Sequence, residues 1–192
     1  VRGQQWAQAL GLAGALADRG VVSDVFTLNT AISAYARAFR WPSALLLFSS
    51  DSGFGSAIPD LVSYNSALSA CERGRCWREA LQLLLEARLR KLELDVVSFS
   101  SAVSACSKGL QWQQALALLQ EARAVSAASV ITYNSAISGC ASAGQWPEAL
   151  ALLRDCVAER HSLDVVSFSA AITSCQGRPG EASPSAGVET RW

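Results

Sequence analysis

The sequence repeats itself about every 35 residues along most of its length. Five tryptophans keep this spacing, with separations of 35, 36, 35 and 34 residues: Trp6, Trp41, Trp77, Trp112 and Trp146. A polar series and a cysteine series follow the same period: Asn29, Asn65, Ser100, Asn134 and Ser169, and Cys71, Cys106, Cys140 and Cys175. Self-similarity of this length is typical of solenoids, in which small equivalent units stack on one another. The period therefore predicts an array of units rather than a domain with one central core.

The three series agree on where the units begin and end. We expect four complete units at residues 25–60, 61–95, 96–129 and 130–164, with half units at 1–24 and 165–176, so that the solenoid covers 1–176. Residues 177–192 keep no period and are rich in proline and glycine, which predicts a disordered tail. The chain begins Val-Arg-Gly, contains no methionine and has no signal-peptide pattern. We therefore expect it to be a fragment of a longer product.

Each unit is predicted to contain two helices separated by a short break. In the second unit, residues 62–73 and 77–90 have helical periodicity, and Gly74 and Arg75 separate them. An Ala-Leu pair follows each tryptophan and opens the apolar stripe of the second helix, at Ala44-Leu45, Ala80-Leu81, Ala115-Leu116 and Ala149-Leu150. Because such a hairpin cannot bury its apolar side alone, neighbouring hairpins must stack. The expected fold class is all-α, an α-solenoid (superhelix) of antiparallel helical hairpins.

The first helix of each unit has two contrasting faces. Residues 4, 7, 8 and 11 of a unit share one face at 100° per residue, and in the second unit they are Tyr64, Ala67, Leu68 and Cys71, which predicts a packed face. Residues 2, 5, 9 and 13 share the opposite face, where one apolar residue is followed by hydrogen-bonding groups. They are Phe26, Asn29, Ser33 and Arg37; Val62, Asn65, Ser69 and Arg73; Val97, Ser100, Ser104 and Lys108; Ile131, Asn134, Ser138 and Ser142.

Charge and hydropathy limit the classes of function. Sixteen basic and sixteen acidic residues give a formal net charge of zero, which argues against binding through bulk positive charge. Arg37, Arg73 and Lys108 nevertheless occupy the same position in three units and would align along one groove, where they could meet phosphates. The alternative explanation is a solvated helix end that favours cations. The longest apolar runs are far shorter than the roughly 18 to 20 residues of a membrane span, so we expect no membrane contact.

The openings of the units resemble those of the pentatricopeptide repeat family, whose units of about 35 residues begin with a motif like Val-Val-Thr-Tyr-Asn after an Asp. The segments that are similar to this motif run from Asp24 to Asn29, Asp60 to Asn65, Asp95 to Ser100 and Asp164 to Ser169. The resemblance implies a reader of single-stranded RNA that takes one base per repeat. It also implies a role in organelle RNA processing, stabilisation or translation, and localisation in a chloroplast or mitochondrion.

The resemblance further implies which residues meet the RNA. In the family, the fifth and last residues of a repeat choose the base, which here pairs Asn29 with Asp60, Asn65 with Asp95, Ser100 with Ser129 and Asn134 with Asp164, and leaves Ser169 alone. The second residues sandwich the bases, and they are Phe26, Val62, Val97, Ile131 and Val166. The Asn and Asp combination implies uracil in the first, second and fourth units, whereas the Ser pair is not a common combination and implies no particular base.

The chemistry of these pairs is plausible, and it has a structural alternative. An Asn amide offers a donor and an acceptor to a base edge, and a nearby carboxylate can hold it in one orientation. Asp before a helix is, however, an ordinary N-cap, so Asp60, Asp95 and Asp164 could serve as caps alone.

The remaining conspicuous residues have structural explanations. Each tryptophan precedes a second helix, so we expect it to pack rather than stack on bases, and the cysteines lie on separate layers, which predicts reduced thiols and no metal or other cofactor. His161 is the only histidine and is expected in a solvated loop; with no nucleophile-elbow or deaminase signature, we expect no enzymatic activity.

Single-stranded RNA is thus the expected partner, with no small-molecule substrate, and protein partners could bind through regions outside this chain. The rival interpretation is a protein-binding scaffold like the tetratricopeptide repeats, whose unit is about 34 residues. The Trp-x-x-Leu-Gly-x-x-Tyr pattern of those repeats is absent from this sequence.

Overall fold

The computed structural model describes residues 25–49, 58–159, 168–169 and 172. Within those ranges the chain forms helices joined by short connections and contains no strand. The helices are α2 (Val25–Arg37), α3 (Trp41–Ser49), α4 (Leu61–Gly74), α5 (Trp77–Leu89), α6 (Val96–Lys108), α7 (Trp112–Ala124), α8 (Val130–Ser142) and α9 (Trp146–Ala158). They form four consecutive hairpins, which are the helix pairs predicted for the four complete units.

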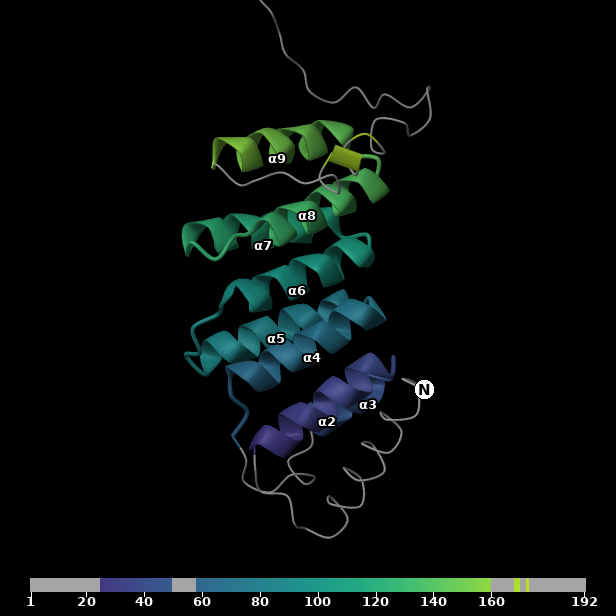
Figure 1. Ribbon diagram of the computed structural model, residues 1–192, viewed down its shortest axis with the longest axis vertical. Helices are drawn as coiled ribbons and strands as arrows, with labels where there is room; N and C mark the ends of the chain where they lie inside the picture. The colour runs from purple at the N-terminus through teal and green to yellow at the C-terminus, as the bar shows by residue number, and fades with distance from the viewer. Residues whose placement is uncertain (1–24, 50–57, 160–167, 170–171, 173–192) are drawn as a thin grey trace, which may run out of the picture.

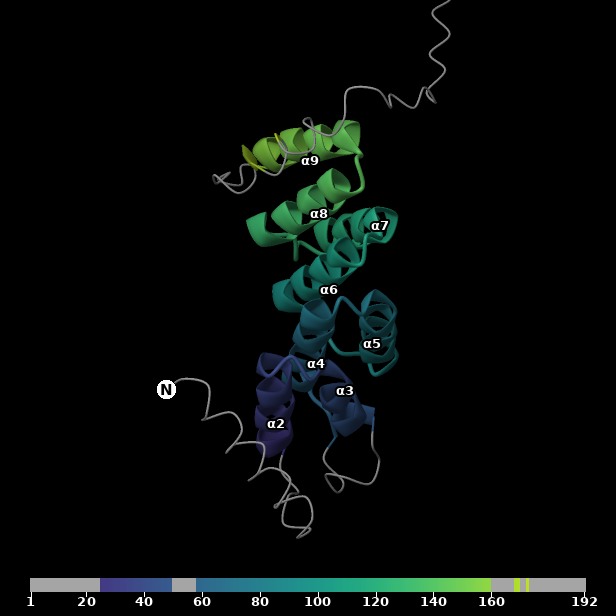
Figure 2. The same ribbon diagram turned by 90° about the vertical axis from the view of Figure 1, so that its right-hand side faces the viewer.

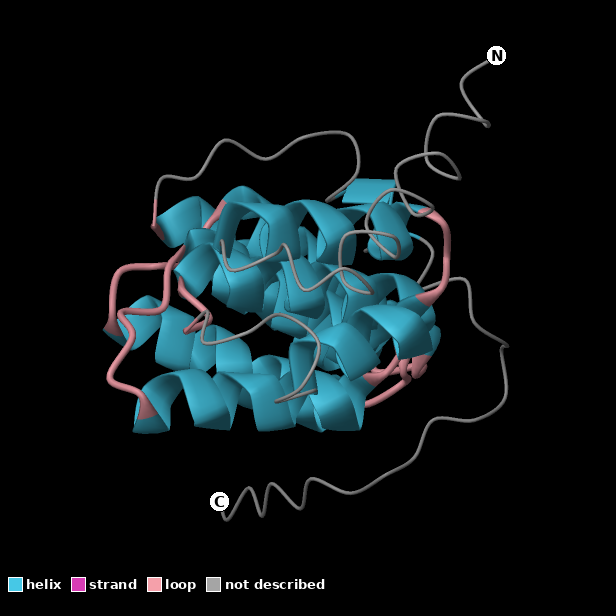
Figure 3. Ribbon diagram, turned by 90° about the horizontal axis from the view of Figure 1, so that it is seen from below, coloured by secondary structure: helices cyan, strands magenta, loops and turns pink. Residues whose placement is uncertain are grey.

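The hairpins stack into an elongated array (Figure 1). Turned by 90°, the array separates into two layers, with the first helices α2, α4, α6 and α8 on one side and α3, α5 and α7 on the other (Figure 2). Each first helix packs against the next first helix, and each of α3, α5 and α7 packs against the first helices of its own and the following unit. Seen along the stack, the helices overlie one another (Figure 3). The α-solenoid of antiparallel hairpins is confirmed.

The second helices contact one another differently from the first helices. Within the described ranges no two of them have closely approaching backbones. Long side chains bridge the distance instead, because Arg88 of α5 pairs with Glu121 of α7, and Arg123 of α7 pairs with Asp155 and Glu159 at 2.9 and 2.7 Å. Exposed pairs of this kind contribute only about 0 to 1 kcal/mol each. The first helices therefore supply the continuous packing of the array.

The core consists of the face predicted from the helical period. Tyr64, Ala67, Leu68 and Cys71 of α4 are fully buried, and the corresponding residues of α6 and α8 are buried as well: Phe99, Ala102, Val103 and Cys106, and Tyr133, Ala136, Ile137 and Cys140. The second helices add small and branched side chains to the same core, and in α5 these are Ala80, Leu83, Leu84 and Ala87. Alternating large and small side chains let successive helices approach closely.

Caps fix where three of the first helices begin. Asp60, Asp95 and Ser129 are the N-caps of α4, α6 and α8, and each forms a reciprocal capping box with the third helical residue, which is Ser63, Ser98 or Thr132. Such a cap contributes about 1 kcal/mol to the stability of a helix. The second helices α5, α7 and α9 have no side-chain cap and start at a tryptophan directly after the break.

Two of the tryptophans pack across the boundary between units. A Cβ atom added to Gly74 would lie 2.5 Å from Cγ of Trp41, and one added to Gly109 would lie 2.6 Å from Cδ1 of Trp77. Each indole therefore lies directly on the backbone of the next unit, where only glycine leaves enough room. Trp112 also packs against the core. The packing role predicted for the tryptophans is confirmed for these three residues.

Trp146 differs, because half of its surface is exposed. The residues 32 or 33 positions further on, where Gly74 and Gly109 stand relative to Trp41 and Trp77, are outside the described part of the chain. Trp6 also lies outside the described residues.

The described cysteines are buried and form no disulfide with one another: Cys71, Cys76, Cys106, Cys140 and Cys156. Burial raises the pKa of Cys71 to about 12 and the pKa values of Cys106 and Cys140 to about 11, so these thiols stay protonated near neutral pH.

Among the described residues no group of His, Cys, Asp and Glu side chains could hold a metal ion. No described helix is long and apolar enough to cross a membrane. His161 and Cys175 are outside the described ranges.

Candidate nucleic-acid interface

Large apolar side chains are exposed at the second position of every described unit. The exposed fractions are large for apolar residues: 76% for Phe26, 57% for Val62, 51% for Val97 and 67% for Ile131. They occupy the same position in α2, α4, α6 and α8, while the opposite face of these helices is buried in the core. A regular row of exposed apolar groups of this kind can contact a flat ligand between successive units. Val166, the fifth residue of the predicted set, lies outside the described residues.

Two of the predicted base-selecting pairs are hydrogen bonded. Nδ2 of Asn29 donates to Oδ1 of Asp60 at 3.2 Å, and Nδ2 of Asn65 donates to both carboxylate oxygens of Asp95 at 3.1 and 3.2 Å. These Asp residues cap the next first helix, and stacking of that helix on the preceding one carries the carboxylate to the Asn. Capping alone is therefore too narrow an explanation, because each carboxylate is both a cap and the partner of an Asn.

The two Asn amides differ in their second contact. Oδ1 of Asn65 accepts a hydrogen bond of 2.6 Å from Oγ of Ser98, so both ends of this amide are fixed by the following unit. Oδ1 of Asn29 is buried and has no hydrogen-bond partner within the described residues. Asn65 is thus held in one orientation, whereas Asn29 is held at its Nδ2 end.

The hydrogen bonds also change the acidity of the capping carboxylates. Partial burial by itself would raise the pKa of Asp95, but the Ser98 backbone N–H and the Asn65 amide favour the ionised form. The Ser98 hydroxyl, whose one proton is shared between Asp95 Oδ1 at 2.9 Å and Asn65 Oδ1 at 2.6 Å, favours it as well, and the pKa of Asp95 lies below its usual value. The pKa of Asp60 is lowered in the same way, against partial burial, by Ser63 and Asn29. Both carboxylates are ionised at neutral pH.

The third unit does not form such a pair. Oγ of Ser100 donates to the Val97 carbonyl at 3.2 Å, and Oγ of Ser129 accepts the Thr132 N–H at 3.4 Å as part of its cap. No hydrogen bond between Ser100 and Ser129 occurs in the described structure, because both hydroxyls are used within their own helices and a Ser is shorter than an Asp. The third unit therefore has no counterpart of the Asn–Asp hydrogen bond, and joint base selection by Ser100 and Ser129 stays a prediction.

The fourth unit is described only in part. Asn134 of α8 faces a pocket between α6 and α8. Its predicted partner, Asp164, is outside the described ranges. Ser169 is helical and exposed.

A pocket of about 300 Å³ brings the three predicted kinds of residue together between α2 and α4. Val62 and Val97, the apolar residues of two successive units, line it together with Asn65. Arg37 and Arg73 line the same pocket, beside the hydroxyls of Ser33, Ser66 and Ser69. One space thus offers apolar contact, an oriented amide and positive charge.

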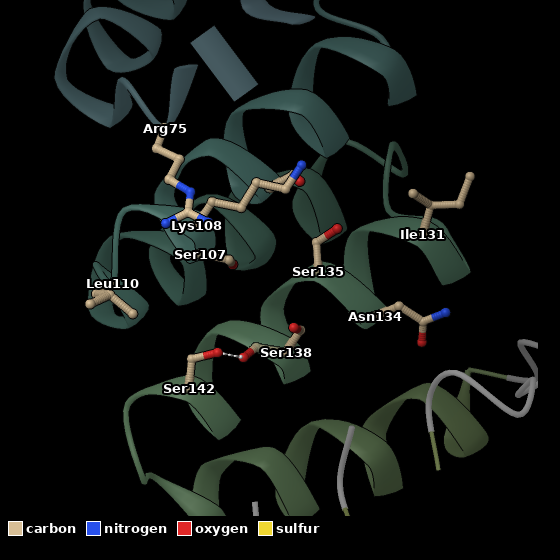
Figure 4. Close-up of a pocket in the computed structure, with 10 residues that line it drawn as sticks. Arg75, Ser107, Lys108, Leu110, Ile131, Asn134, Ser135, Ser138 and Ser142 are labelled. Atoms are coloured by element: carbon tan, nitrogen blue, oxygen red, sulfur yellow. Dashed lines mark hydrogen bonds between the residues drawn. The ribbon is translucent and has the colours of Figure 1, made fainter. Parts of the chain in front are cut away.

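A second pocket, of about 530 Å³, repeats this composition between α6 and α8 (Figure 4). Ile131 and Asn134 line it from α8, Lys108 lines it from the end of α6, and Arg75 reaches it from the end of α4. Both pockets therefore combine an apolar second residue, an Asn at the fifth position and two cationic side chains.

Comparison with known families finds repeats in three parts of the chain. A family model described as PPR repeat matches residues 26–50, 62–92 and 131–160, and each match begins at the second residue of a predicted unit. These three segments are pentatricopeptide repeats. The unit without a match, 96–129, is the one whose Ser100 and Ser129 do not pair.

Solved structures of a pentatricopeptide repeat protein share the fold. The crystal structure of PPR10 from maize has a TM-score of 0.72 and 23% identity, over 90% of this chain and 25% of that one. The structure of PPR10 in complex with an 18-nt psaJ RNA element has a TM-score of 0.68 and 22% identity, over 80% of this chain and 23% of that one. The present chain thus spans about a quarter of the length of PPR10. A comparison with curated proteins gave no match.

The predicted column of cations in these pentatricopeptide repeats is not uniform. Arg37 and Arg73 are exposed and form no ion pair with any described residue. Lys108 does not match them, because its Nζ donates to Oε1 of Glu72 at 2.8 Å, and Oγ of Ser104 donates to the same oxygen at 2.9 Å. The carboxylate of one repeat pairs with the cation of the next, so Lys108 differs electrostatically from Arg37 and Arg73, and contact of all three with phosphates stays a prediction.

Three residues of the interface were missed by the sequence pattern. Ser98 is recognisable as the third residue after an N-cap, but its contact with Asn65 depends on how adjacent repeats stack. Glu72 stands 36 residues before Lys108, a spacing close to the repeat that would have suggested a contact. Arg75 was assigned to the break between helices, and its place in the second pocket follows from the backbone conformation of that break.

Proposed function

We propose that this chain is a sequence-selective module that binds single-stranded RNA, one base per repeat. The observation that carries the proposal is the pocket between α2 and α4, in which Val62, Val97 and Asn65 share one space with Arg37 and Arg73. A base inserted between the two valines would lie on apolar surface on both faces, and its edge would meet the Asn65 amide. The two arginines would be available to the phosphates on either side.

The held amide of Asn65 supports a preference for uracil. With Nδ2 donating to Asp95 and Oδ1 accepting from Ser98, the amide still offers one N–H donor and one lone pair, in a fixed order. Uracil presents a carbonyl oxygen beside its N3–H, which complements that order. Cytosine has an acceptor in place of the N3–H, so it loses one of the two hydrogen bonds.

The order of bases follows from the repeats and from the polarity of the family. We propose uracil, uracil, an unassigned base and uracil, 5′ to 3′ from the first to the fourth repeat. Because the chain contains about four complete repeats, the affinity is expected to be weak. Local positive charge at Arg37 and Arg73 allows a protein of zero net charge to attract a polyanion.

Titration of fluorescent eight-nucleotide RNAs, followed by anisotropy, tests the proposal. Oligo(U) should bind more tightly than oligo(A) or oligo(C). Replacing Asn65 by Ser should move the preference at the second position away from uracil, toward guanine by family analogy, and leave the others unchanged. Asn134→Ser is the matched control, because it should change the fourth position instead.

Two outcomes would contradict the proposal. Equal weakening on all RNAs by Asn65→Ser would mean that Asn65 has a structural role. Absence of RNA binding together with specific capture of proteins would favour the scaffold interpretation.

In the cell, we propose that the chain acts by binding transcripts in a chloroplast or mitochondrion, where it supports their processing, stabilisation or translation without catalysing a reaction itself. The basis is the match of three segments to pentatricopeptide repeats. Crosslinking and immunoprecipitation from whole cells should recover organellar transcripts containing short uracil-rich segments, and recovery of nuclear transcripts alone would contradict the assignment.

A further inference from the structure

The pocket between α6 and α8 contains a cation that does not belong to the predicted column. We propose that Arg75, rather than Lys108, holds a backbone phosphate of the bound RNA in this pocket, with the hydroxyl of Ser107 as a second donor. The inference rests on the proposed RNA binding and adds the group that positions the strand beside the third and fourth repeats. Arg75, Ser107 and Lys108 all line this pocket (Figure 4).

Lys108 is already bound. Its ammonium lies 2.8 Å from Oε1 of Glu72, and Ser104 donates to the same carboxylate oxygen. A phosphate that took Lys108 would first have to break this ion pair, and it would leave the half-buried Glu72 carboxylate without its cation. Two negative groups would then compete for one positive group.

Arg75 has no such constraint. It is exposed and forms no ion pair with the described residues, yet it lines the pocket. Its φ of 57° lies in the left-handed region, and Phe39, Leu110 and Gly144 occupy the same turn in the other units, with φ of 56°, 60° and 73°. Among these four positions only Arg75 carries a charge, so the turn presents a cation in one repeat alone.

Ser107 is a second, independent indication of a ligand. Its side chain is 7% exposed, and its Oγ has no hydrogen-bond partner within the described part of the chain. Ser107 packs against Gly139 of the neighbouring helix, since a Cβ atom there would lie 2.6 Å from Oγ. A buried hydroxyl without a partner is unfavourable, and a ligand or a water molecule that supplies an acceptor relieves this cost.

The remaining lining suits an anion on a nucleotide. No described Asp or Glu lines the pocket, and the hydroxyls of Ser135, Ser138 and Ser142 add polar surface. A phosphate accepts hydrogen bonds from a guanidinium and from hydroxyls. Free inorganic phosphate has the same chemistry, but Ile131 and Asn134, at the second and fifth positions of the fourth repeat, line the same pocket and favour a phosphate attached to a base.

The test is a comparison of four single variants in RNA titrations at several salt concentrations. Arg75→Gln should weaken binding of oligo(U) and oligo(C) by the same factor, about threefold to tenfold, and reduce the slope of log affinity against log salt by about 0.7. Lys108→Gln should change both quantities less than Arg75→Gln does. Arg78→Gln is the matched control, because Arg78 is exposed and its guanidinium lies over the Trp77 ring, 5.0 Å from the ring centre.

Ser107→Ala separates binding from folding. Because the hydroxyl has no partner in the described structure, its loss should leave the thermal unfolding temperature unchanged or raised, while RNA binding weakens. Excess inorganic phosphate at constant ionic strength should not displace the RNA, and displacement would mean that the pocket is a site for free phosphate.

The outcomes distinguish this inference from the function on which it rests. If the wild-type chain binds no RNA, both fail. If it binds RNA and Arg75→Gln matches Arg78→Gln, or Lys108→Gln has the larger effect, the assignment of Arg75 fails while the proposed function stands.

Discussion

Oγ of Ser98 lies 2.6 Å from Oδ1 of Asn65, so a hydroxyl of the third repeat holds an amide of the second. The corresponding hydroxyl of Ser63 donates to Asp60 at 2.9 Å and forms no described bond to Asn29. Both serines are fully buried members of a capping box. The same structural element therefore orients the amide in one repeat and not in the other.

Ser98→Ala should reduce the ratio of uracil to cytosine affinity at the second position, because the Asn65 amide can then rotate. Ser63→Ala is the control: it should cost about the same stability, about 0.5 to 1.5 kcal/mol, without changing the choice of base. Paired anisotropy titrations and urea unfolding measure the two effects. An equal loss of base selectivity in both variants would mean that fraying of the helix start, and not rotation of the Asn65 amide, causes the effect.

Asp95→Asn should separate the two roles of this residue. Asn is as good an N-cap as Asp, so the free energy of unfolding should fall by less than about 1 kcal/mol. Base preference at the second position should nevertheless change, because an amide can present either a donor or an acceptor to Asn65.

Ser129→Ala is the opposite control, because it removes the N-cap of α8. It should lower the free energy of unfolding by about 1 kcal/mol and leave the uracil preference at the second position intact.

Glu72→Gln should strengthen RNA binding, because it releases Lys108. We expect the salt slope to steepen by about 0.7, the contribution of one phosphate on a single strand. The loss of one ion pair, partly exposed on both sides, should lower stability by no more than about 1 kcal/mol. Adding Lys108→Gln to this variant should cancel the gain. An unchanged slope in Glu72→Gln would show that Lys108 lies too far from the strand to contact it.

Gly109→Ala should destabilise the array by about 1 to 3 kcal/mol, because the new methyl group overlaps Trp77. The same substitution in a Trp77→Leu background should cost less, since the smaller side chain leaves room. Chemical denaturation of the two single variants and the double variant gives the coupling energy. Additive costs would mean that the indole moves aside without penalty.

Acid should weaken the fold through Asp60 and Asp95. Their pKa values are lower in the folded chain than the usual 3.8, so they contribute stability that is present above that pH and is lost as the pH falls through the folded values. The free energy of unfolding should therefore decline below about pH 4. It should decline less steeply in Asp95→Asn, which has no carboxyl group to protonate there. Identical pH profiles of the wild type and Asp95→Asn would mean that Asp95 does not contribute to the loss of stability in acid.

Features that depend on helical period were predictable from the sequence, and features that depend on the rotation of one helix against the next were not. The burial of Tyr64 and the exposure of Val62 follow from residue spacing within a single helix. The Asn65 and Asp95 contact was available only through family resemblance. The 36-residue spacing of Glu72 and Lys108 suggests that they are neighbours, but their pairing also needs the offset between α4 and α6, which the spacing does not fix.

Trp77 of the second unit packs on Gly109 of the third, and Ser98 of the third unit contacts Asn65 of the second. Transplanting residues 61–95 into another array would therefore leave behind the hydroxyl that orients the amide and the glycine that accepts the indole. A graft running from residue 61 to residue 109 would carry both. The segment that keeps these two contacts is thus longer than the period of the sequence, and successive grafts must share part of a repeat.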